Sequence, residues 1–578
     1  MADHQSASVT TKLETLWDQS QGNPARFLFA AYQEAVVRTS VIDVREGLSW
    51  LNSIKLRSEL PTLRVSVITN FVIQGMQDPL ELFLVLLGLN PIIEYHPPYQ
   101  FEADVSGAQA VLLLIDYEKF VGPDGVADHS ALREWVARLK AGAAKAKILM
   151  NDPFQPPSQS LLTPEHEWER GRTLEREVDA IAEDLGVTLV RWNGPLQSSG
   201  LALNHRASHY IHYDQILTSA GLGLAANVFA RYVAALFTPR KKVVCMDADN
   251  TLWFGMVGED GADGVLFLPD SAPGRCYYRV LRQLQSLSAA GLLLAIVSKN
   301  NENTVLDVLA RPDFPLKRED FSAVRINWRA KSQNLKEIAA ELNLALDSFV
   351  YVDDSEFEIA EVLSALPEVA AVQVPKRIED YGGLFGSIPG LDRLHVTKED
   401  RERKNEYHLQ AKRRRVREEN PVDFARKLSI TVQVHPAKPM ELARVAQLFL
   451  KTNQFRFALS RPTEEEIKSL IDKEGWIVLA IFYSDIFGDS GLVGGALLQN
   501  ERGNWHVRNL VISCRVIGRG VEEALLADWS KRYAPLRVDF ETSGRNQVAE
   551  ACLNRAGWVP NTILMPRPAP ESIKLIYT

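Results

Sequence analysis

Short apolar runs alternate with stretches of helical periodicity along the first part of the chain. An apolar run at 63–68 is followed by a helical pattern over 79–89. Further apolar runs lie at 110–115, 147–150 and 188–192. Runs of this length are typical of buried parallel strands joined by helical crossovers. We predict a helical arm over residues 1–58 and a parallel α/β domain over 59–238, closed by a helix at 220–237.

The same alternation continues over residues 239–392. The predicted buried strands are 242–246, 291–297 and 348–352. The interval between the first two has room for a loop, a short hairpin and one helix at 277–290, and an amphipathic helix at 331–342 precedes the third. Neither interval has room for an inserted domain. We therefore predict a Rossmann-like α/β domain whose strand ends stay open.

The remainder of the chain begins with charged residues and then mixes strands with helices. Residues 397–400 are typical of a helix N-cap with an acidic first turn, and the helix would run to 420 through the basic residues 412–415. We take 393–427 as a charged connector. Its basic run is either a solvated helix face or a docking surface for an acidic carrier protein.

An α+β domain is predicted over residues 428–578. The strands are expected at 430–434, 476–483, 491–499, 505–512 and 536–540, with helices at 440–452 and 521–532. The whole chain is therefore expected to be a multidomain α/β protein.

Composition limits the function classes. The 578 residues are too many for one core, and 46% hydrophobic with 24% charged residues is ordinary for a globular protein. A net charge of −8 argues against a general nucleic-acid binder. The four scattered cysteines form no disulfide framework or zinc motif, and there is no apolar leader or membrane-length apolar run. We expect a cytoplasmic protein with neither nucleic-acid nor membrane partners.

Candidate chemistry begins where the strand 242–246 ends. The sequence there is Asp247-Ala-Asp249-Asn-Thr251, followed by a loop rich in glycine. Carboxyl ends of parallel strands are where open α/β sheets bind ligands. Asp247 is expected to attack phosphorus and form an aspartyl-phosphate, and Asp249 to protonate the leaving oxygen and later activate water. Thr251 completes the catalytic motif.

Three further motifs follow in order along the chain. The strand ending at 297 leads into Ser298-Lys-Asn, Lys331 opens a helix, and the strand ending at 352 leads into Asp353-Asp354. Ser298 and Lys331 are expected to hold phosphate oxygens. Close carboxylates repel each other, so we expect Asp247, Asp249 and Asp353 to bind Mg²⁺, a hard cation that prefers oxygen ligands.

The order of these motifs resembles that of the haloacid dehalogenase (HAD) superfamily. The residues within them resemble the FkbH-like branch, subfamily IIIC. The resemblance rests on Asp-Asn-Thr-Leu-Trp, Gly-Glu-Asp-Gly, Ser-Lys-Asn, Ile-Asn-Trp-Arg-Ala-Lys and Val-Asp-Asp-Ser-Glu-Phe-Glu, and continues into residues 451–455, 485–494 and 513–519. It covers about residues 225–560. Members of this branch supply glyceryl units to acyl carrier proteins in polyketide assembly. An uncapped site also favours a large partner such as a carrier protein.

The first α/β domain resembles an SGNH-hydrolase fold, but without its catalytic residues. Thr69-Asn70 stands where a serine nucleophile is expected, and Asp214-Gln-Ile-Leu replaces the Asp-x-x-His motif. His205, His209 and His212 are closely spaced, and either a metal or catalytic cluster or ordinary hydrogen-bonded histidines would explain them. We predict a degenerate docking or scaffold domain.

A second candidate site follows the strand 505–512. Arg515-Val-Ile-Gly518-Arg519-Gly520 leads into a helix, and glycines before a helix N-terminus let backbone N–H groups bind a pyrophosphate. With Asn546 downstream, this order resembles the coenzyme A loop of the GNAT acyltransferase fold. The ligand would be coenzyme A or the phosphopantetheine arm of a carrier protein, which share one chemical group.

Together the two sites suggest a substrate that carries both a phosphate and an activated acyl group. In the FkbH-like family this is 1,3-bisphosphoglycerate, a small phosphorylated acyl donor, which is dephosphorylated and transferred to an acyl carrier protein. Relatives often have cysteine where this chain has Ala248, so Cys514 is the alternative catalytic thiol, or else a packing residue. The other hypothesis is a GNAT-type transferase that moves an acyl group from coenzyme A or a carrier to an amine or hydroxyl, with an accessory phosphatase.

Overall fold

The computed structural model describes most of the chain and divides it into two compact units. The first unit spans residues 1–401 apart from 341–343, and the second spans 402–578 together with 341–343. The described residues are 9–20, 23–35, 41–54, 56–98, 100, 102–120, 129–143, 145–154, 164–394, 396, 428–452, 454–471, 473–486, 488–513, 516–543, 546–568, 570 and 572–577. The predicted connector helix over 397–420, Cys514 and Arg515 lie outside these residues.

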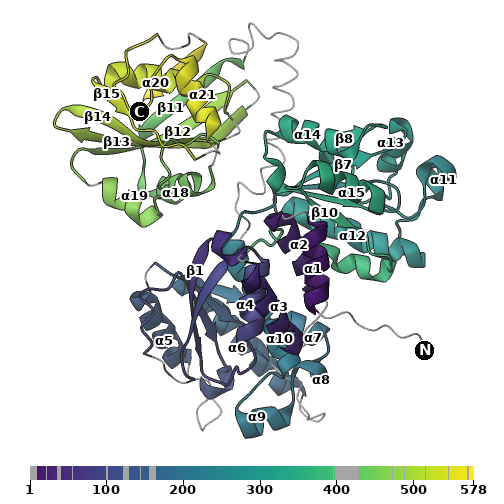
Figure 1. Ribbon diagram of the computed structural model, residues 1–578. Coiled ribbons are helices and arrows are strands. Elements are labelled where there is room, and N and C mark those ends of the chain that lie inside the picture. The colour runs from purple at the N-terminus through teal and green to yellow at the C-terminus, as the bar shows by residue number, and fades with distance from the viewer. Residues whose placement is uncertain are drawn as a thin grey trace. The chain divides into compact units, whose positions relative to one another are not determined.

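The first sheet is entirely parallel, with strand order β2-β1-β3-β4-β5. Figure 1 labels β1 of this sheet and helices of the same region, among them α4, α5 and α10. Its strands are β1 (Thr62–Thr69), β2 (Asn90–Tyr95), β3 (Ala110–Leu114), β4 (Lys147–Asn151) and β5 (Thr188–Val190). The helices of this region are α1 (Val9–Gln19), α2 (Pro24–Ala35), α3 (Val41–Ser53), η1 (Leu56–Glu59), α4 (Gln77–Leu86), η2 (Tyr117–Phe120), α5 (His129–Gly142), α6 (Pro164–Leu185), α7 (Asn193–Ser198), α8 (Leu201–Asn204), α9 (Ala207–Tyr213) and α10 (Ser219–Phe237).

Side chains alternate between the two faces of this sheet. Val65 and Val67 belong to a core with helices α1 to α4 and α10, whereas Val111 and Leu113 belong to a core with α5 and α6. This is the alternation that a strand imposes when both faces are covered. The predicted strands at 63–68, 110–115, 147–150 and 188–192 are confirmed, and β2 was not predicted.

The second sheet is also parallel, with order β10-β9-β6-β7-β8. Its strands are β6 (Val243–Met246), β7 (Leu293–Ser298), β8 (Phe321–Ile326), β9 (Phe349–Asp353) and β10 (Ala370–Gln373). The helices are α11 (Val257–Gly264), α12 (Ala272–Ala289), α13 (Glu302–Ala310), η3 (Arg318–Asp320), α14 (Lys331–Leu342), η4 (Leu346–Ser348), α15 (Glu356–Ala365) and η5 (Ile378–Ser387). α12, α13 and η5 share one core with the sheet.

This region differs from its prediction in one element. A short hairpin was expected after Thr251, but α11 stands there, and the paired backbone of this segment consists of two isolated bridges, Asp249 with Trp253 and Phe254 with Leu266. The prediction that no domain is inserted between the strands is confirmed for the described residues, which run without a gap from 164 to 394. Short loops and helices, rather than an inserted domain, therefore follow the strand ends of this sheet.

The third sheet lies in the second unit and is mostly antiparallel, with order β15-β14-β13-β12-β11-β16. Its strands are β11 (Ile430–Pro436), β12 (Trp476–Asp485), β13 (Gly488–Glu501), β14 (Asn504–Ile512), β15 (Leu536–Val538) and β16 (Ile573–Tyr577). The helices are η6 (Pro439–Glu441), α18 (Leu442–Lys451), α19 (Glu464–Ile471), α20 (Val521–Arg532) and α21 (Gln547–Arg555). α20 and α21 pack on one face and α18 and α19 on the other, so the α+β prediction is confirmed.

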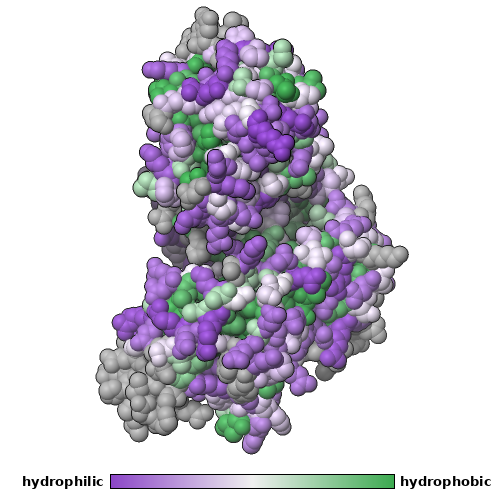
Figure 2. All heavy atoms as spheres, turned by 90° about the vertical axis from the view of Figure 1, so that its left-hand side faces the viewer, coloured by the Kyte–Doolittle hydropathy of each residue, from purple (hydrophilic) through white to green (hydrophobic). Residues whose placement is uncertain are grey.

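Among the helices that the structure describes, one is long and apolar enough to cross a membrane. It is α10, whose mean hydropathy reaches 1.5 over its most apolar window, but 67% of that window is buried inside the protein. α10 packs against α4 and contributes Phe229 and Val233 to the first core, which is the behaviour of a core helix. Figure 2 shows polar side chains interspersed with small apolar patches on one face of the molecule.

Candidate active site

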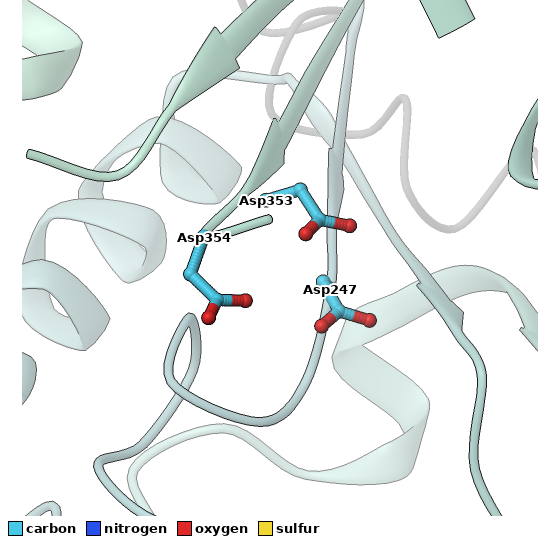
Figure 3. A group of neighbouring side chains, drawn as sticks. All are labelled: Asp247, Asp353 and Asp354. Atoms are coloured by element: carbon cyan, nitrogen blue, oxygen red, sulfur yellow. The ribbon is translucent and has the colours of Figure 1, made fainter. Parts of the chain in front are cut away.

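Three carboxylates meet at the carboxyl ends of β6 and β9. The strands lie side by side in parallel, and the Asp247 N–H donates to the Val352 carbonyl at 2.9 Å, which places Asp247 beside Asp353. One oxygen each from Asp247, Asp353 and Asp354 lies within 4.8 Å of the others. Figure 3 shows the three side chains facing a common space. The strand register therefore brings together carboxylates more than a hundred residues apart in sequence.

The turn after β6 is held by its own short side chains. Asn250 has a φ of 51° and Gly255 a φ of 105°, both in the left-handed region that asparagine and glycine tolerate best. The Asn250 side chain accepts a hydrogen bond from the Gly255 N–H at 3.0 Å. A Cβ at Gly255 would lie 2.7 Å from an Asp260 side-chain oxygen, and the positive φ itself favours glycine there.

Lys331 joins two of the carboxylates. Its Nζ donates to Asp247 Oδ1 at 2.6 Å, to Asp353 Oδ2 at 3.1 Å and to the Val297 carbonyl at 2.8 Å. Burial alone would lower the pKa of Lys331, but the charges of Asp247 and Asp353 raise it, so the amine stays protonated. Three carboxylates against one buried amine leave the site short of positive charge.

Burial has the opposite effect on the carboxyl groups. It raises the pKa of Asp247, and the Lys331 charge opposes that rise. Burial and the adjacent charge of Asp353 raise the pKa of Asp354 to about 6. Desolvated like charges disfavour ionisation, so a cation placed among them is stabilising. Carboxylate oxygens are ligands of the kind that Mg²⁺ prefers, so these three residues fit that ion.

Asp249 is held apart from this cluster by hydrogen bonds. Its Oδ1 accepts from Trp253 Nε1 at 2.9 Å and from the Val257 N–H at 3.0 Å, and its Oδ2 accepts from Asn300 Nδ2 at 2.8 Å. A carboxylate oxygen has two lone pairs, so Oδ1 is fully used and Oδ2 keeps one. Oδ2 is therefore the atom that can carry a proton.

The remaining predicted residues lie around Asp247. Ser298 is buried at the end of β7, and a hydrogen bond from its side chain lowers the pKa of Asp247. The Thr251 hydroxyl is fully buried with no hydrogen-bond partner among the described residues, while its carbonyl accepts from Tyr381 at 2.8 Å. The structure thus brings Asp247, Ser298, Lys331 and Asp353 together.

The geometry revises the predicted metal set. The grouping contains Asp354, which the sequence marked as a strand-end residue but not as a ligand, and it does not contain Asp249. The Asp249 carboxylate instead accepts hydrogen bonds from Trp253, Val257 and Asn300. Sequence reasoning also missed Trp253, Asn300 and Tyr351. Trp253 and Asn300 stand inside quoted motifs, but the contacts of Tyr351 require the neighbouring strand.

The candidate residues of the first α/β region are each bound by other residues of the chain. The Thr69 hydroxyl donates to the Phe71 carbonyl at 2.9 Å and accepts from the Phe71 N–H at 3.1 Å. Asp214 forms a 2.5 Å ion pair with Lys119, and His205 Nδ1 lies 2.7 Å from the Ile216 carbonyl. None of the histidines belongs to the carboxylate grouping found among the described residues. These contacts agree with a degenerate site.

The glycine loop before α20 is also engaged by the chain itself. The Gly518 N–H donates at 2.7 Å to the carboxylate of Glu522, a buried residue in the first turn of α20. Gly520 has a φ of 83° and caps that helix. Burial raises the pKa of Glu522 to about 7. An internal carboxylate therefore stands where a phosphate oxygen was expected.

The side chains predicted to bind the cofactor turn inward as well. Arg519 is almost buried, with its guanidinium 3.8 Å from Asp485 and 5.0 Å above the Tyr483 ring. Asn546 is fully buried. Its amide donates to the carbonyls of Arg456 and Glu541 at 3.0 and 2.8 Å, and its oxygen accepts from the N–H and hydroxyl of Ser543 at 2.8 and 3.1 Å.

An asparagine side chain has two donors and two acceptor lone pairs, and all four are used in Asn546. Its role is therefore structural rather than cofactor binding. The residues described here do not fit coenzyme A, because Gly518, Arg519 and Asn546 are each bound by the chain. Cys514 and Arg515 lie outside the described residues.

β14 and β15 diverge along their length, and residues 455–459 lie between them where they no longer pair. The two strands pair only over residues 505–507 and 536–538. Beyond that point the Phe457 N–H donates to the Leu510 carbonyl at 3.1 Å, and the Glu541 N–H donates to the Phe457 carbonyl at 2.8 Å. Residues 455–459 thus lie between β14 and the chain that follows β15.

Comparison with known proteins finds one solved structure with a similar fold over more than half of the chain. The N-terminal part of a Bacteroides fragilis protein containing a phosphatase domain, complexed with Mg, matches 59% of this chain and 96% of its own, at 19% identity and a TM-score of 0.52. At that identity the likeness shows a shared fold and no more. No protein-family model matches the chain, and no curated protein does.

Two further likenesses are weaker. A protein described as an SGNH hydrolase from Slackia heliotrinireducens matches 30% of this chain and all of its own, at 13% identity and a TM-score of 0.23. An N-acetyltransferase region of a fungal multidomain β-N-acetylglucosaminidase matches 96% of this chain and 69% of its own, at 12% identity and a TM-score of 0.17. With TM-scores below 0.5, these two likenesses support no conclusion about the chain.

Proposed function

We propose that this chain is a Mg²⁺-dependent phosphoryl-transfer enzyme of the HAD type, with Asp247 as nucleophile. The observation that carries the proposal is the convergence of Asp247, Asp353 and Asp354 around Lys331 at the open ends of a parallel sheet. Structural carboxylate clusters are neutralised by the chain, whereas this one keeps an excess of negative charge. The likeness to a phosphatase-domain protein complexed with Mg supports the same conclusion.

The reaction would proceed in two balanced steps. An oxygen of Asp247 attacks the phosphorus, the bond from phosphorus to the leaving oxygen breaks, and Asp249 Oδ2 gives that oxygen a proton. Water then attacks the aspartyl-phosphate while Asp249 Oδ2 takes its proton, which releases inorganic phosphate and restores Asp247. Trp253, Val257 and Asn300 keep Asp249 oriented for both transfers.

The other residues of the site stabilise charge. Lys331 is positioned to bind phosphate oxygens as they gain charge, and Ser298 keeps Asp247 ionised through its hydrogen bond. Asp247, Asp353 and Asp354 would hold Mg²⁺. When bound, Mg²⁺ neutralises the phosphate and lets a carboxylate approach it.

For the substrate, we propose 1,3-bisphosphoglycerate and an acyl carrier protein, as the FkbH-like resemblance implies. The carboxylate site would remove the phosphate ester. The thiol of the phosphopantetheine arm would attack the acyl carbon, a thioester would form, and the acyl-phosphate oxygen would leave as inorganic phosphate. The open strand ends support a substrate attached to a large partner, because no inserted domain covers them among residues 164–394.

The test is intact-mass spectrometry of a phosphopantetheinylated carrier protein after incubation with the enzyme, Mg²⁺ and 1,3-bisphosphoglycerate. A glyceryl mass increment that Asp247→Asn abolishes would support the whole proposal. A phosphoglyceryl increment with Asp247→Asn would assign dephosphorylation to Asp247 and transfer to another site. Phosphate release without any mass increment would support the phosphatase activity but refute the carrier protein as the acyl acceptor.

The alternative, a coenzyme A-dependent GNAT-type transferase, is less well supported. Its loop is occupied by Glu522, and Asn546 is committed to backbone groups. Coenzyme A titrated into the full chain by calorimetry tests it directly. Binding at micromolar concentration would restore this alternative.

A further inference from the structure

Tyr351 contacts the candidate metal site from inside the sheet. It lies two residues before Asp353 on β9, so both side chains point to the same face. Its hydroxyl donates to Asp353 Oδ2, and the two residues are 0% and 1% exposed. A buried phenol whose one donor goes to a carboxylate fixes the position of that carboxylate.

The hydrogen bonds of Asp353 differ between its two oxygens. Oδ2 accepts from the Tyr351 hydroxyl and from Lys331 Nζ, so both of its lone pairs are used. Oδ1 accepts only from the Ser355 N–H, at 2.8 Å, among the hydrogen bonds between described residues. One lone pair, on Oδ1, is therefore left for a cation.

We infer that Tyr351 is a positioning residue that makes Asp353 present a single oxygen to the metal and so favours Mg²⁺ over Ca²⁺. This inference rests on the metal site of the proposed function. Mg²⁺ demands near-ideal octahedral geometry, whereas Ca²⁺ accepts six to eight oxygens and binds carboxylates through one or both oxygens. A carboxylate with one oxygen already occupied suits the smaller ion.

Loss of the hydroxyl would release Oδ2. In Tyr351→Phe the ring stays in the core, but Asp353 Oδ2 keeps only the Lys331 bond. The carboxylate can then turn and offer both oxygens. Partners that orient ligands typically contribute about 10–100-fold to metal affinity. We expect the Kd for Mg²⁺ to rise by about that factor, and the Kd for Ca²⁺ to rise less or to fall.

Calorimetric titration of the chelator-treated full chain with MgCl₂ and separately with CaCl₂ tests the inference. The matched control is Tyr32→Phe, another buried tyrosine, whose hydroxyl donates to Asn227 Oδ1 at 2.8 Å in a different core. Both variants lose one buried hydrogen bond, so a purely structural effect changes their melting temperatures alike. Only Tyr351→Phe should change the ratio of the two Kd values.

The outcomes separate this inference from the proposed function. A shifted ratio in Tyr351→Phe with an unchanged ratio in Tyr32→Phe supports the role of Tyr351. An unchanged ratio in both variants, with Mg²⁺ still bound by the wild-type chain, overturns that role and leaves the metal site intact. Absence of Mg²⁺ binding by the wild-type chain overturns both.

Discussion

The two candidate sites have a similar local structure but differ in whether neighbouring residues already bind their polar groups. One loop follows β6, which pairs in parallel with β9, and the other follows β14, which pairs in parallel with β15. Both loops were expected to bind a phosphate. Around Asp247 three carboxylates face one lysine, so charge is left over. Around Gly518 the donor is already bound to Glu522. A motif predicts where the backbone turns, but neighbouring elements decide whether its polar groups remain available for a ligand.

The largest expected difference between the two sites appears when one acidic group is removed from each. Asp247→Asn should lower the rate of phosphate release by about four orders of magnitude, as expected when a nucleophile is lost. Glu522→Gln should leave that rate unchanged, because its carboxylate serves the loop alone. A colorimetric phosphate assay with saturating Mg²⁺ measures both, and equal losses in the two variants would contradict the assignment.

Removal of the Lys331 charge should lower the free energy of unfolding. Lys331→Met leaves Asp247 and Asp353 facing each other in the core, and we expect a loss of about 3–5 kcal/mol in unfolding free energy. Lys299→Met is the control, because Lys299 is partly exposed and pairs only with Glu358, so its loss should cost less than about 1 kcal/mol. Denaturant unfolding of the full chain measures both. Added Mg²⁺ should restore part of the Lys331 deficit; no recovery would argue against a cation site.

The loop should respond to pH through Glu522. Its pKa is raised from an ordinary 4.5 to about 7 in the folded chain, so the folded state binds more protons between those values. Its stabilising contribution is complete below pH 4.5 and is lost as pH rises through about 7, a change of up to about 3 kcal/mol. Hydrogen exchange of α20 peptides at several pH values, compared with Glu522→Gln, measures it. An identical pH dependence in the variant would refute the buried carboxylate.

The smallest effect concerns Asn546. Asn546→Ala removes the donor to the buried Arg456 carbonyl and to the partly buried Glu541 carbonyl, and we expect the second unit to lose about 2 kcal/mol. Asn554→Ala, on the same helix, is a control. Local hydrogen exchange at residues 454–461 should rise only for Asn546→Ala. If the variant kept its stability but changed ligand binding, the predicted cofactor role would be restored.

Much of the fold follows from pattern, because apolar runs place the strands of a parallel sheet. β6, β7 and β9 were predicted, and so the strand-end residues Asp247, Ser298 and Asp353 were found together. β2 was missed because it starts Asn90-Pro91 and has a mixed pattern of burial at the sheet edge. The roles of Tyr351 and Glu522 could not be predicted, because each depends on a contact made in three dimensions.

The pairing of β11 with β16 has a consequence for how the second unit folds. These strands come from opposite ends of its sequence, with Ile430 beside Ile573. Contacts between distant residues form slowly, because a long loop must close before they are made. We expect the second unit to keep one edge of β11 unpaired until β16, its last strand, is added.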